Sequence, residues 1–213
     1  MNKRNIIAII SFILFIILLI LVKTNQIIPF DTAIYNGISP YINSNLTKIF
    51  NSISFLGSGI TITIICLSIL FVSYFYKKTK AGFVLGLSIA INSVLSEILK
   101  TIIQRPRPDV LRLAVENSYS FPSSHTLAST SACGILLYIL YKSSINKNLK
   151  IIIGIILVFI LFIIAYSRVY LGVHNASDVL GGFLLAITLL LIEIDIFEKK
   201  ELLKWFTTYT FTS

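Results

Sequence analysis

Charged residues are scarce in this chain. Only 13% of its 213 residues are charged, 56% are hydrophobic, and acidic residues number 9 against 18 basic ones. A soluble domain of this length needs more polar residues to cover its surface, so the composition favours a membrane protein. The length suits one compact bundle and leaves no room for a second soluble domain. We therefore expect a single membrane domain over residues 1–213.

Cysteine is rare as well, and Cys66 and Cys133 both fall inside apolar runs. This placement favours buried thiols in membrane helices over a disulfide or a metal site. The net charge of +9 raises the question of nucleic-acid binding. The basic residues, however, stand in short clusters between apolar runs, as juxtamembrane charges do. We expect the chain to bind a lipid bilayer and no nucleic acid.

Long apolar runs dominate the chain. Six of them are long enough, or nearly so, to cross a hydrocarbon core of about 30 Å at about 1.5 Å per residue. They are Ile6–Val22, Ile60–Tyr76, Ala81–Leu99, Thr126–Tyr141, Ile151–Tyr166 and Ala176–Phe197. None shows the alternation of barrel strands, so the fold class predicted is an all-α membrane protein with six transmembrane helices. The first run resembles a signal peptide, but no small-residue cleavage site follows it. Residues 1–23 are therefore predicted to be a retained first transmembrane helix.

The connections between these runs differ in length. Tyr76–Ala81 and Lys142–Lys150 are short, whereas residues 23–59 and 100–125 are long. Within the first long connection, apolar residues recur at helical spacing, namely Ile42, Leu46, Ile49, Phe50 and Ile53. This pattern indicates either a short helix in the membrane interface or an ordinary packed connector.

Three polar clusters interrupt the apolar sequence. They are Lys100–Pro108 (KTIIQRPRP), Phe121–His125 (FPSSH) and Ser167–Asp178 (SRVYLGVHNASD), and they contain both histidines of the chain. If successive helices alternate in direction, the connections after the third and fifth runs open on the same side of the membrane. We therefore expect one site that combines Lys100, Arg107, His125, Arg168, His174 and Asp178.

The cations of this set suit an anion with two or more charges. Lys100, Arg107 and Arg168 would attract it, and the two guanidinium groups match the oxygens of a phosphate. Ser123 and Ser124 stand at a predicted helix start, where free backbone N–H groups and the helix dipole also favour an anion.

The histidines supply reactive groups. His174 and Asp178 are four residues apart and share one face of a helix, so the carboxylate can accept a ring N–H and leave the other nitrogen free to attack phosphorus. His125 can protonate the leaving oxygen and then activate water. Phosphoryl transfer requires mainly alignment and charge stabilisation, and this set offers both.

Each cluster alone has a simpler interpretation. Lys100 can be a membrane-interface anchor that Glu97 neutralises, and Arg105-Pro-Arg-Pro can be a stiff basic connector. Pro-Ser-Ser-His can be a helix cap, and the His174–Asp178 pair a packed hydrogen bond or part of a metal site. No nearby residue offers an obvious third metal ligand. The three clusters together, in this order, favour the phosphate site.

These clusters resemble the signature of the type 2 phosphatidic acid phosphatase family, which shares its core with vanadium haloperoxidases. That signature is a Lys, six residues and Arg-Pro; then Pro-Ser-Gly-His; then Ser-Arg, five residues, His, three residues and Asp. Lys100 to Arg107 and Ser167 to Asp178 have the family's spacing, and the resemblance covers roughly residues 50–195. Ser124 stands where the signature most often has Gly, and its side chain could crowd the phosphate or donate a further hydrogen bond.

The resemblance implies a six-helix bundle that forms a covalent phosphohistidine on His174. Asp178 would orient His174, and His125 would act as acid and base. Phosphate would be bound by Lys100, Arg107, Ser123, Arg168 and backbone N–H groups. No metal or other cofactor is expected.

The activity expected is hydrolysis of the terminal phosphate of a lipid phosphate, such as phosphatidic acid or phosphatidylglycerol phosphate. Undecaprenyl-diphosphate phosphatase is the alternative, because the motifs contact phosphate and not the lipid tail. Vanadate-dependent halide oxidation is suggested only by the core that the family shares with the haloperoxidases, and those relatives are soluble. A transporter-like bundle is the non-enzymatic alternative, but it would place polar groups near the membrane midplane rather than at helix ends.

The distribution of Lys and Arg predicts the orientation. Without the site cations, eleven basic residues fall on the side of the termini and four on the opposite side. The four are Lys23, Lys48, Arg105 and Arg112. The positive-inside rule then places both termini in the cytoplasm and the site at the outer face of a bacterial plasma membrane.

Overall fold

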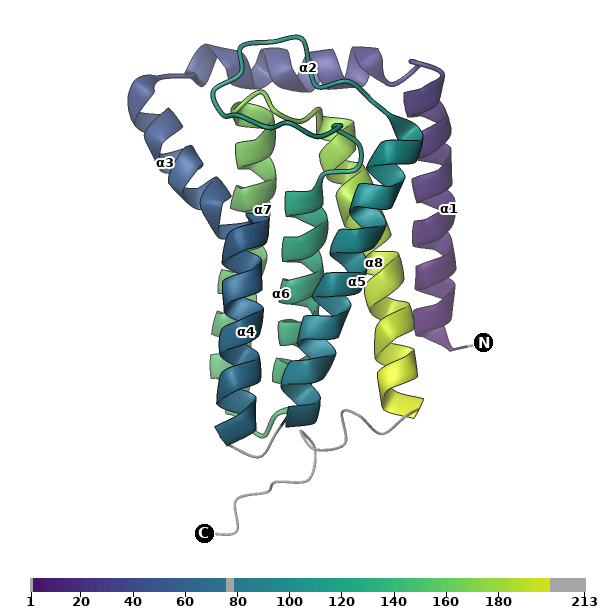
Figure 1. Cartoon of the computed structure of the whole chain (residues 1–213), viewed down its shortest axis with the longest axis vertical. Helices are drawn as coiled ribbons and strands as arrows, with labels where there is room; N and C mark the ends of the chain where they lie inside the picture. The colour runs from purple at the N-terminus through teal and green to yellow at the C-terminus, as the bar shows by residue number, and fades with distance from the viewer. Residues whose placement is uncertain (1, 76–78, 200–213) are drawn as a thin grey trace.

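Six long helices form the bundle in the computed structural model, which describes residues 2–75 and 79–199 (Figure 1). They are α1 (Lys3–Lys23), α4 (Gly59–Phe75), α5 (Thr79–Ile103), α6 (Ser124–Lys142), α7 (Lys147–Tyr170) and α8 (Ala176–Lys199). Five contain one of the predicted apolar runs, and α4 contains the described part of the run Ile60–Tyr76, so the all-α, six-helix prediction is confirmed. The short connection after Lys142 is confirmed too. Of the one predicted over Tyr76–Ala81, residues 76–78 lie outside the described residues and residues 79–81 belong to α5.

Among the described residues, four helical segments are long and apolar enough to cross a membrane. They are α1, α7, α8 and the part of α5 from residue 86 to residue 103. The described part of α4 has 17 residues, and the first half of α6 carries several Ser and Thr residues. Large apolar side chains are exposed on the outside of the bundle, including Ile13 on α1, Phe71 on α4 and Phe159 on α7. A surface of this kind is suited to lipid tails and not to water.

The first long connection contains two helices. α2 (Ile28–Ile38) lies across one end of the bundle and continues through a 3-10 turn (Ser39–Tyr41), and α3 (Ser44–Leu56) leads on to α4 (Figure 1). The Asn43 side chain caps α3 by accepting a hydrogen bond from Leu46 N at 2.9 Å. Of the two interpretations that the helical spacing left open, a helix is present as α3, and it packs on α7 through Leu46 and Phe50. The sequence analysis did not predict α2.

The second long connection, residues 104–123, crosses the same end of the bundle beside α2 (Figure 1). Leu113 N donates to Leu171 O at 2.9 Å, which ties the connection to the turn after α7. Gly172 lies in that turn with φ +66°, and a Cβ there would lie 2.2 Å from Leu111 O. Only glycine permits both the conformation and the approach. The two connections after α5 and α7 thus meet, as their predicted topology requires.

Small and polar residues bring the inner helices together. A Cβ on Gly182 of α8 would lie 2.8 Å from Ser123 O, so α8 directly contacts the start of α6. Cys133 is buried as a free thiol, as expected, whereas the side chain of Cys66 lies outside the described residues.

Buried polar side chains also occur midway along the helices. Asn92 of α5 donates to Ser131 of α6 at 2.9 Å, and Ser88 donates to Glu193 of α8. Polar residues are therefore not limited to the three clusters at the helix ends. Hydrophobic patterning missed these residues because they lie within runs that are apolar on average.

Candidate active site

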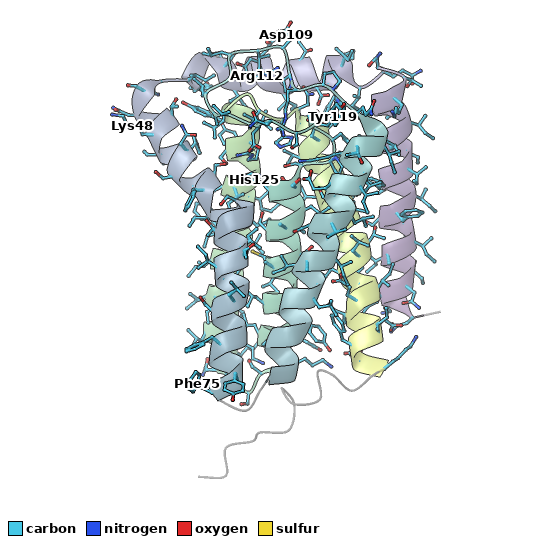
Figure 2. All side chains as sticks on the ribbon, in the orientation of Figure 1. Lys48, Phe75, Asp109, Arg112, Tyr119 and His125 are labelled. Carbon is cyan, nitrogen blue, oxygen red and sulfur yellow. The ribbon has the colours of Figure 1, made fainter. Side chains whose placement is uncertain are left out.

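The predicted site residues converge at the end of the bundle that α2 and residues 104–123 cover. Lys100 is near the end of α5, His125 is at the start of α6, and Arg168 is near the end of α7. Arg107, His174 and Asp178 come from the covering connection, the α7–α8 turn and the first turn of α8 respectively. Figure 2 shows His125 below the connection that carries Asp109, Arg112 and Tyr119.

Two of the cations share one hydroxyl group. Lys100 Nζ donates to Ser118 Oγ at 3.0 Å, and Arg107 Nη2 donates to the same oxygen at 3.2 Å. Arg107 is fixed further by bonds from Nε to Ser118 O at 2.8 Å and from Nη1 to Val173 O at 2.7 Å. Glu97 lies 3.3 Å from Lys100 Nζ, as the sequence suggested. The Arg107 fork is thereby fixed beside the turn that carries His174.

The geometry around His174 defines its tautomer. Arg107 Nη1 lies 3.1 Å from His174 Nε2, and a guanidinium can only donate, so Nε2 must be the unprotonated nitrogen. The proton is then on Nδ1, which lies 3.6 Å from Asp178 Oδ2. Burial, together with the charges of Arg168, Arg107 and Lys100, keeps the pKa of His174 well below its ordinary value of 6.5. The ring is neutral at neutral pH, with a lone pair on Nε2 toward the cations.

The Asp178 carboxylate is fully buried and has well-defined partners. Its Oδ2 accepts from Asn175 N at 2.8 Å, and its Oδ1 accepts from Arg105 Nη1 at 2.5 Å. In the described part of the chain, His174 Nδ1 has no hydrogen-bond partner within bonding distance, and the Asp178 oxygen is its nearest carboxylate contact. A small approach of the two side chains would complete the pair.

A carboxylate lies among the remaining cationic groups. Glu116, on residues 104–123, accepts a hydrogen bond from Arg168 Nη2 and lies 3.8 Å from Arg107 Nη2 and 4.0 Å from His125 Nδ1. Arg168 Nη1 donates to Ser54 Oγ of α3. Its Nε is buried without a partner among the described residues, so this N–H remains available to a ligand. Glu116 thus marks a position that an anion can occupy between three predicted site residues.

The two serines before His125 differ in orientation. Ser123 caps α6, and its buried Oγ accepts from Thr126 N at 3.4 Å and from Thr126 Oγ1 at 3.1 Å, which leaves its own proton free to donate. Ser124 Oγ lies 2.9 Å from Ser96 Oγ and donates to Glu97 Oε1 at 3.4 Å. The Ser124 hydroxyl therefore points to α5, while the start of α6 presents its backbone N–H groups.

Residues that the sequence analysis did not include complete the site. Arg105, treated there as part of a connector, contacts Asp178 and also Asp31 of α2. Glu116 and Ser118 contact the cations, and neither belongs to a cluster with a recognisable spacing. A search of the described residues finds no group of three or more His, Cys, Asp or Glu side chains placed to bind a metal ion.

Comparison with known proteins identifies the family of this chain. The model of the PAP2 superfamily matches residues 81–202, which include all three clusters. Phosphatidylglycerophosphatase B of Bacillus subtilis (strain 168) is 33% identical over 194 residues, which are 89% of this chain and 93% of that protein. An undecaprenyl-diphosphatase of Sulfolobus acidocaldarius is 35% identical over 130 residues, 56% of this chain and 58% of that protein.

Two solved structures have the same architecture. A crystal structure of a transmembrane PAP2-type phosphatidylglycerolphosphate phosphatase from Bacillus subtilis matches with a TM-score of 0.83 and 32% identity, over 90% of this chain and 96% of that chain. Aquifex aeolicus LpxE matches with a TM-score of 0.62 and 28% identity, over 77% and 94% of the two chains. The motif spacing, the converging side chains and these matches lead to one conclusion: the chain belongs to the PAP2 superfamily.

Proposed function

We propose that this multi-pass membrane lipid phosphatase cleaves the terminal phosphate of its substrate through a phosphohistidine on His174. The observation that carries the proposal is the pairing of Nε2 with Arg107 Nη1 at 3.1 Å, with Nδ1 directed to Asp178. The unprotonated nitrogen faces the cations that would bind a phosphate, so the nucleophile and the anion site adjoin.

The reaction would proceed in two displacements. In the first, Nε2 forms a bond to phosphorus while the bond from phosphorus to the lipid oxygen breaks. His125 enters this step protonated, stabilised by the charge of the bound phosphate, and gives its proton to that oxygen. In the second, His125 takes a proton from water, whose oxygen attacks phosphorus as the P–N bond breaks and inorganic phosphate leaves. Asp178 would accept a hydrogen bond from Nδ1–H and stabilise the positive charge that the ring acquires.

Phosphate binding would use the groups that have donors to spare. Arg107 has one Nη2–H to spare and would exchange its Nη1 bond to His174 Nε2 for a phosphate oxygen, which also frees the Nε2 lone pair. Arg168 has a buried Nε–H without a partner among the described residues, and Lys100 adds a third charge. Ser123 would donate its hydroxyl proton, and Ser124 would contribute its backbone N–H, because its hydroxyl is directed to α5. No metal ion enters either step, since these cations supply the charge that the transition state needs.

We propose phosphatidylglycerol phosphate as the substrate, because Bacillus phosphatidylglycerophosphatase B is similar over nearly the whole chain. Undecaprenyl diphosphate is the second candidate, and the similarity to the Sulfolobus undecaprenyl-diphosphatase favours it. We also propose that the site is at the outer face of a bacterial plasma membrane. Arg105 proves to contact Asp178, so it joins the site cations, and only Lys23, Lys48 and Arg112 remain as basic residues on that side.

The test is phosphate release by purified protein in detergent. The substrates compared are phosphatidylglycerol phosphate, phosphatidic acid and undecaprenyl diphosphate. Halide oxidation by the same protein is assayed in parallel. We expect release that survives EDTA and is fastest, by kcat/KM, with phosphatidylglycerol phosphate. Preference for undecaprenyl diphosphate would select the second candidate, and no release from any lipid by folded protein would overturn the proposal.

A further inference from the structure

Arg105 lies between two buried carboxylates from opposite ends of the sequence. Its Nη1 donates to Asp178 Oδ1 at 2.5 Å, and its Nη2 donates to Asp31 Oδ2 at 2.7 Å. The side chains of Asp31 and Asp178 are 5% and 0% exposed, and that of Arg105 is 12% exposed. An ion triad this well shielded from water interacts strongly, because solvent screens it little.

Asp31 also binds the start of α8. Its Oδ1 accepts from Ser177 N at 2.8 Å, and its Oδ2 accepts from Ser177 Oγ at 2.7 Å. Ser177 directly precedes Asp178, so α2 is connected both to the backbone of that turn and, through Arg105, to the carboxylate. Asp31 lies outside residues 81–202, the part of the chain that matches the PAP2 superfamily model.

We propose that Asp31 and Arg105 are positioning residues that set the direction and effective charge of Asp178 toward His174. This inference rests on the proposed function and extends it to α2. Arg105 fixes Oδ1, which leaves Oδ2 on the side of His174 Nδ1, at 3.6 Å. The direction of the carboxylate is thus imposed from the side away from the substrate.

Charge also connects Asp31 with His174. Asp31, Arg105 and Asp178 together carry one net negative charge, and His174 is the ring that faces it. That charge stabilises the ring when phosphorylation makes it positive. Without Asp31, Arg105 would neutralise Asp178 and the group would carry no net charge. Asp31 therefore preserves the electrostatic effect of Asp178 although it does not touch His174.

A double-mutant cycle separates this role from simple docking of α2. Asp31→Asn should lower kcat by about 10- to 100-fold while KM changes by less than about threefold, the size typical of a residue that orients a reactive group. Asp178→Asn should lower kcat by about 100- to 10,000-fold. In the Asp178→Asn background, Asp31→Asn should change kcat by less than about twofold, because the residue through which it acts is already altered.

The matched control is Asp109→Asn. Asp109 is exposed on residues 104–123 and makes no ion pair within the described part of the chain, so its kinetics should equal those of the wild type. Thermal unfolding in the same detergent verifies that each variant is folded. If Asp31→Asn does not fold, Asp31→Glu replaces it, because it retains the charge and displaces the carboxylate.

The outcomes distinguish the inference from the proposed function. A kcat for Asp31→Asn within twofold of wild type, a loss confined to KM, or an equal loss in both backgrounds overturns the positioning role. A folded wild-type protein without phosphatase activity, or an Asp178→Asn variant with normal kcat, instead overturns the proposed function.

Discussion

Replacing Arg107 with Lys tests the geometry of the phosphate site, because it retains the charge and removes the fork. Arg107 directs donors to Ser118 O, Ser118 Oγ, Val173 O and His174 Nε2, over distances of 2.7 to 3.2 Å. A Lys ammonium presents its donors from a single atom and cannot reach all these partners. It would also bind one phosphate oxygen where the guanidinium binds two.

The expected loss follows from one missing charged hydrogen bond in the transition state. Such a bond contributes about 2 to 3 kcal/mol. At about 1.36 kcal/mol for each factor of ten, kcat/KM should fall by about 30- to 150-fold. The loss should appear in kcat as well as in KM, because phosphate charge and geometry change most in the transition state.

The assay is initial-rate phosphate release in detergent across a range of lipid phosphate concentrations. Arg112→Lys is the control, because Arg112 is an exposed guanidinium of the same connection whose Nε contacts Pro108 O at 3.3 Å. It should retain normal kinetics. If Arg107→Lys remains within threefold of wild type while folded, Arg107 does not bind phosphate through its fork and the reasoning fails.

Further predictions concern charge, pH, metal and topology. Glu116→Gln should tighten inhibition by orthophosphate about fivefold, since it removes a competing carboxylate whose ion pair contributes about 1 kcal/mol; an unchanged inhibition constant would exclude that competition. Because the folded pKa of His174 lies well below 6.5, its contribution to stability should be complete above pH 6.5 and decline as the pH falls below that value, whereas the ring in the folded protein should stay a neutral nucleophile to lower pH; thermal unfolding and a pH–rate profile measure the two effects. EDTA should leave phosphate release unchanged and vanadate should inhibit it, whereas rescue by Mg²⁺ after chelation would refute metal independence. In a cysteine-free background, an impermeant maleimide should label a cysteine at exposed Asn117 in intact cells but not one at exposed Ser144, and the reverse pattern would invert the topology.

The helices and the side chains that converge in the candidate site could be predicted from the sequence because each leaves a local signal. Apolar runs of sufficient length define the six long helices. Fixed sequence spacings indicate that His174 pairs with Asp178 and that Lys100 and Arg107 belong to one motif. Helical spacing also indicated α3. These signals act over a few turns of helix, where periodicity and chemistry are directly visible.

Other contacts could not be predicted, because they join distant parts of the chain without any pattern. Asp31 is separated from Arg105 by 74 positions, and its helix α2 was read as connector. Glu116 is in a connection with no periodicity, and only the folded chain brings it to Arg168. The orientation of the Ser124 hydroxyl depends on α5, from which Ser96 and Glu97 approach it. Tertiary packing, and not local sequence, determines these three.

The central claim is that His174 carries the phosphoryl group, and trapping the intermediate tests it most directly. Enzyme mixed with a lipid substrate labelled in its terminal phosphate is quenched within milliseconds in alkaline detergent, and the label is mapped by mass spectrometry. The account predicts an acid-labile, alkali-stable phosphate on the peptide that contains His174, and none in folded His174→Ala, whose turnover should fall by about four orders of magnitude. Label on His125 of the wild-type protein would contradict this claim. A His174→Ala variant that carries as much label as the wild type and keeps more than a tenth of its activity would contradict it too.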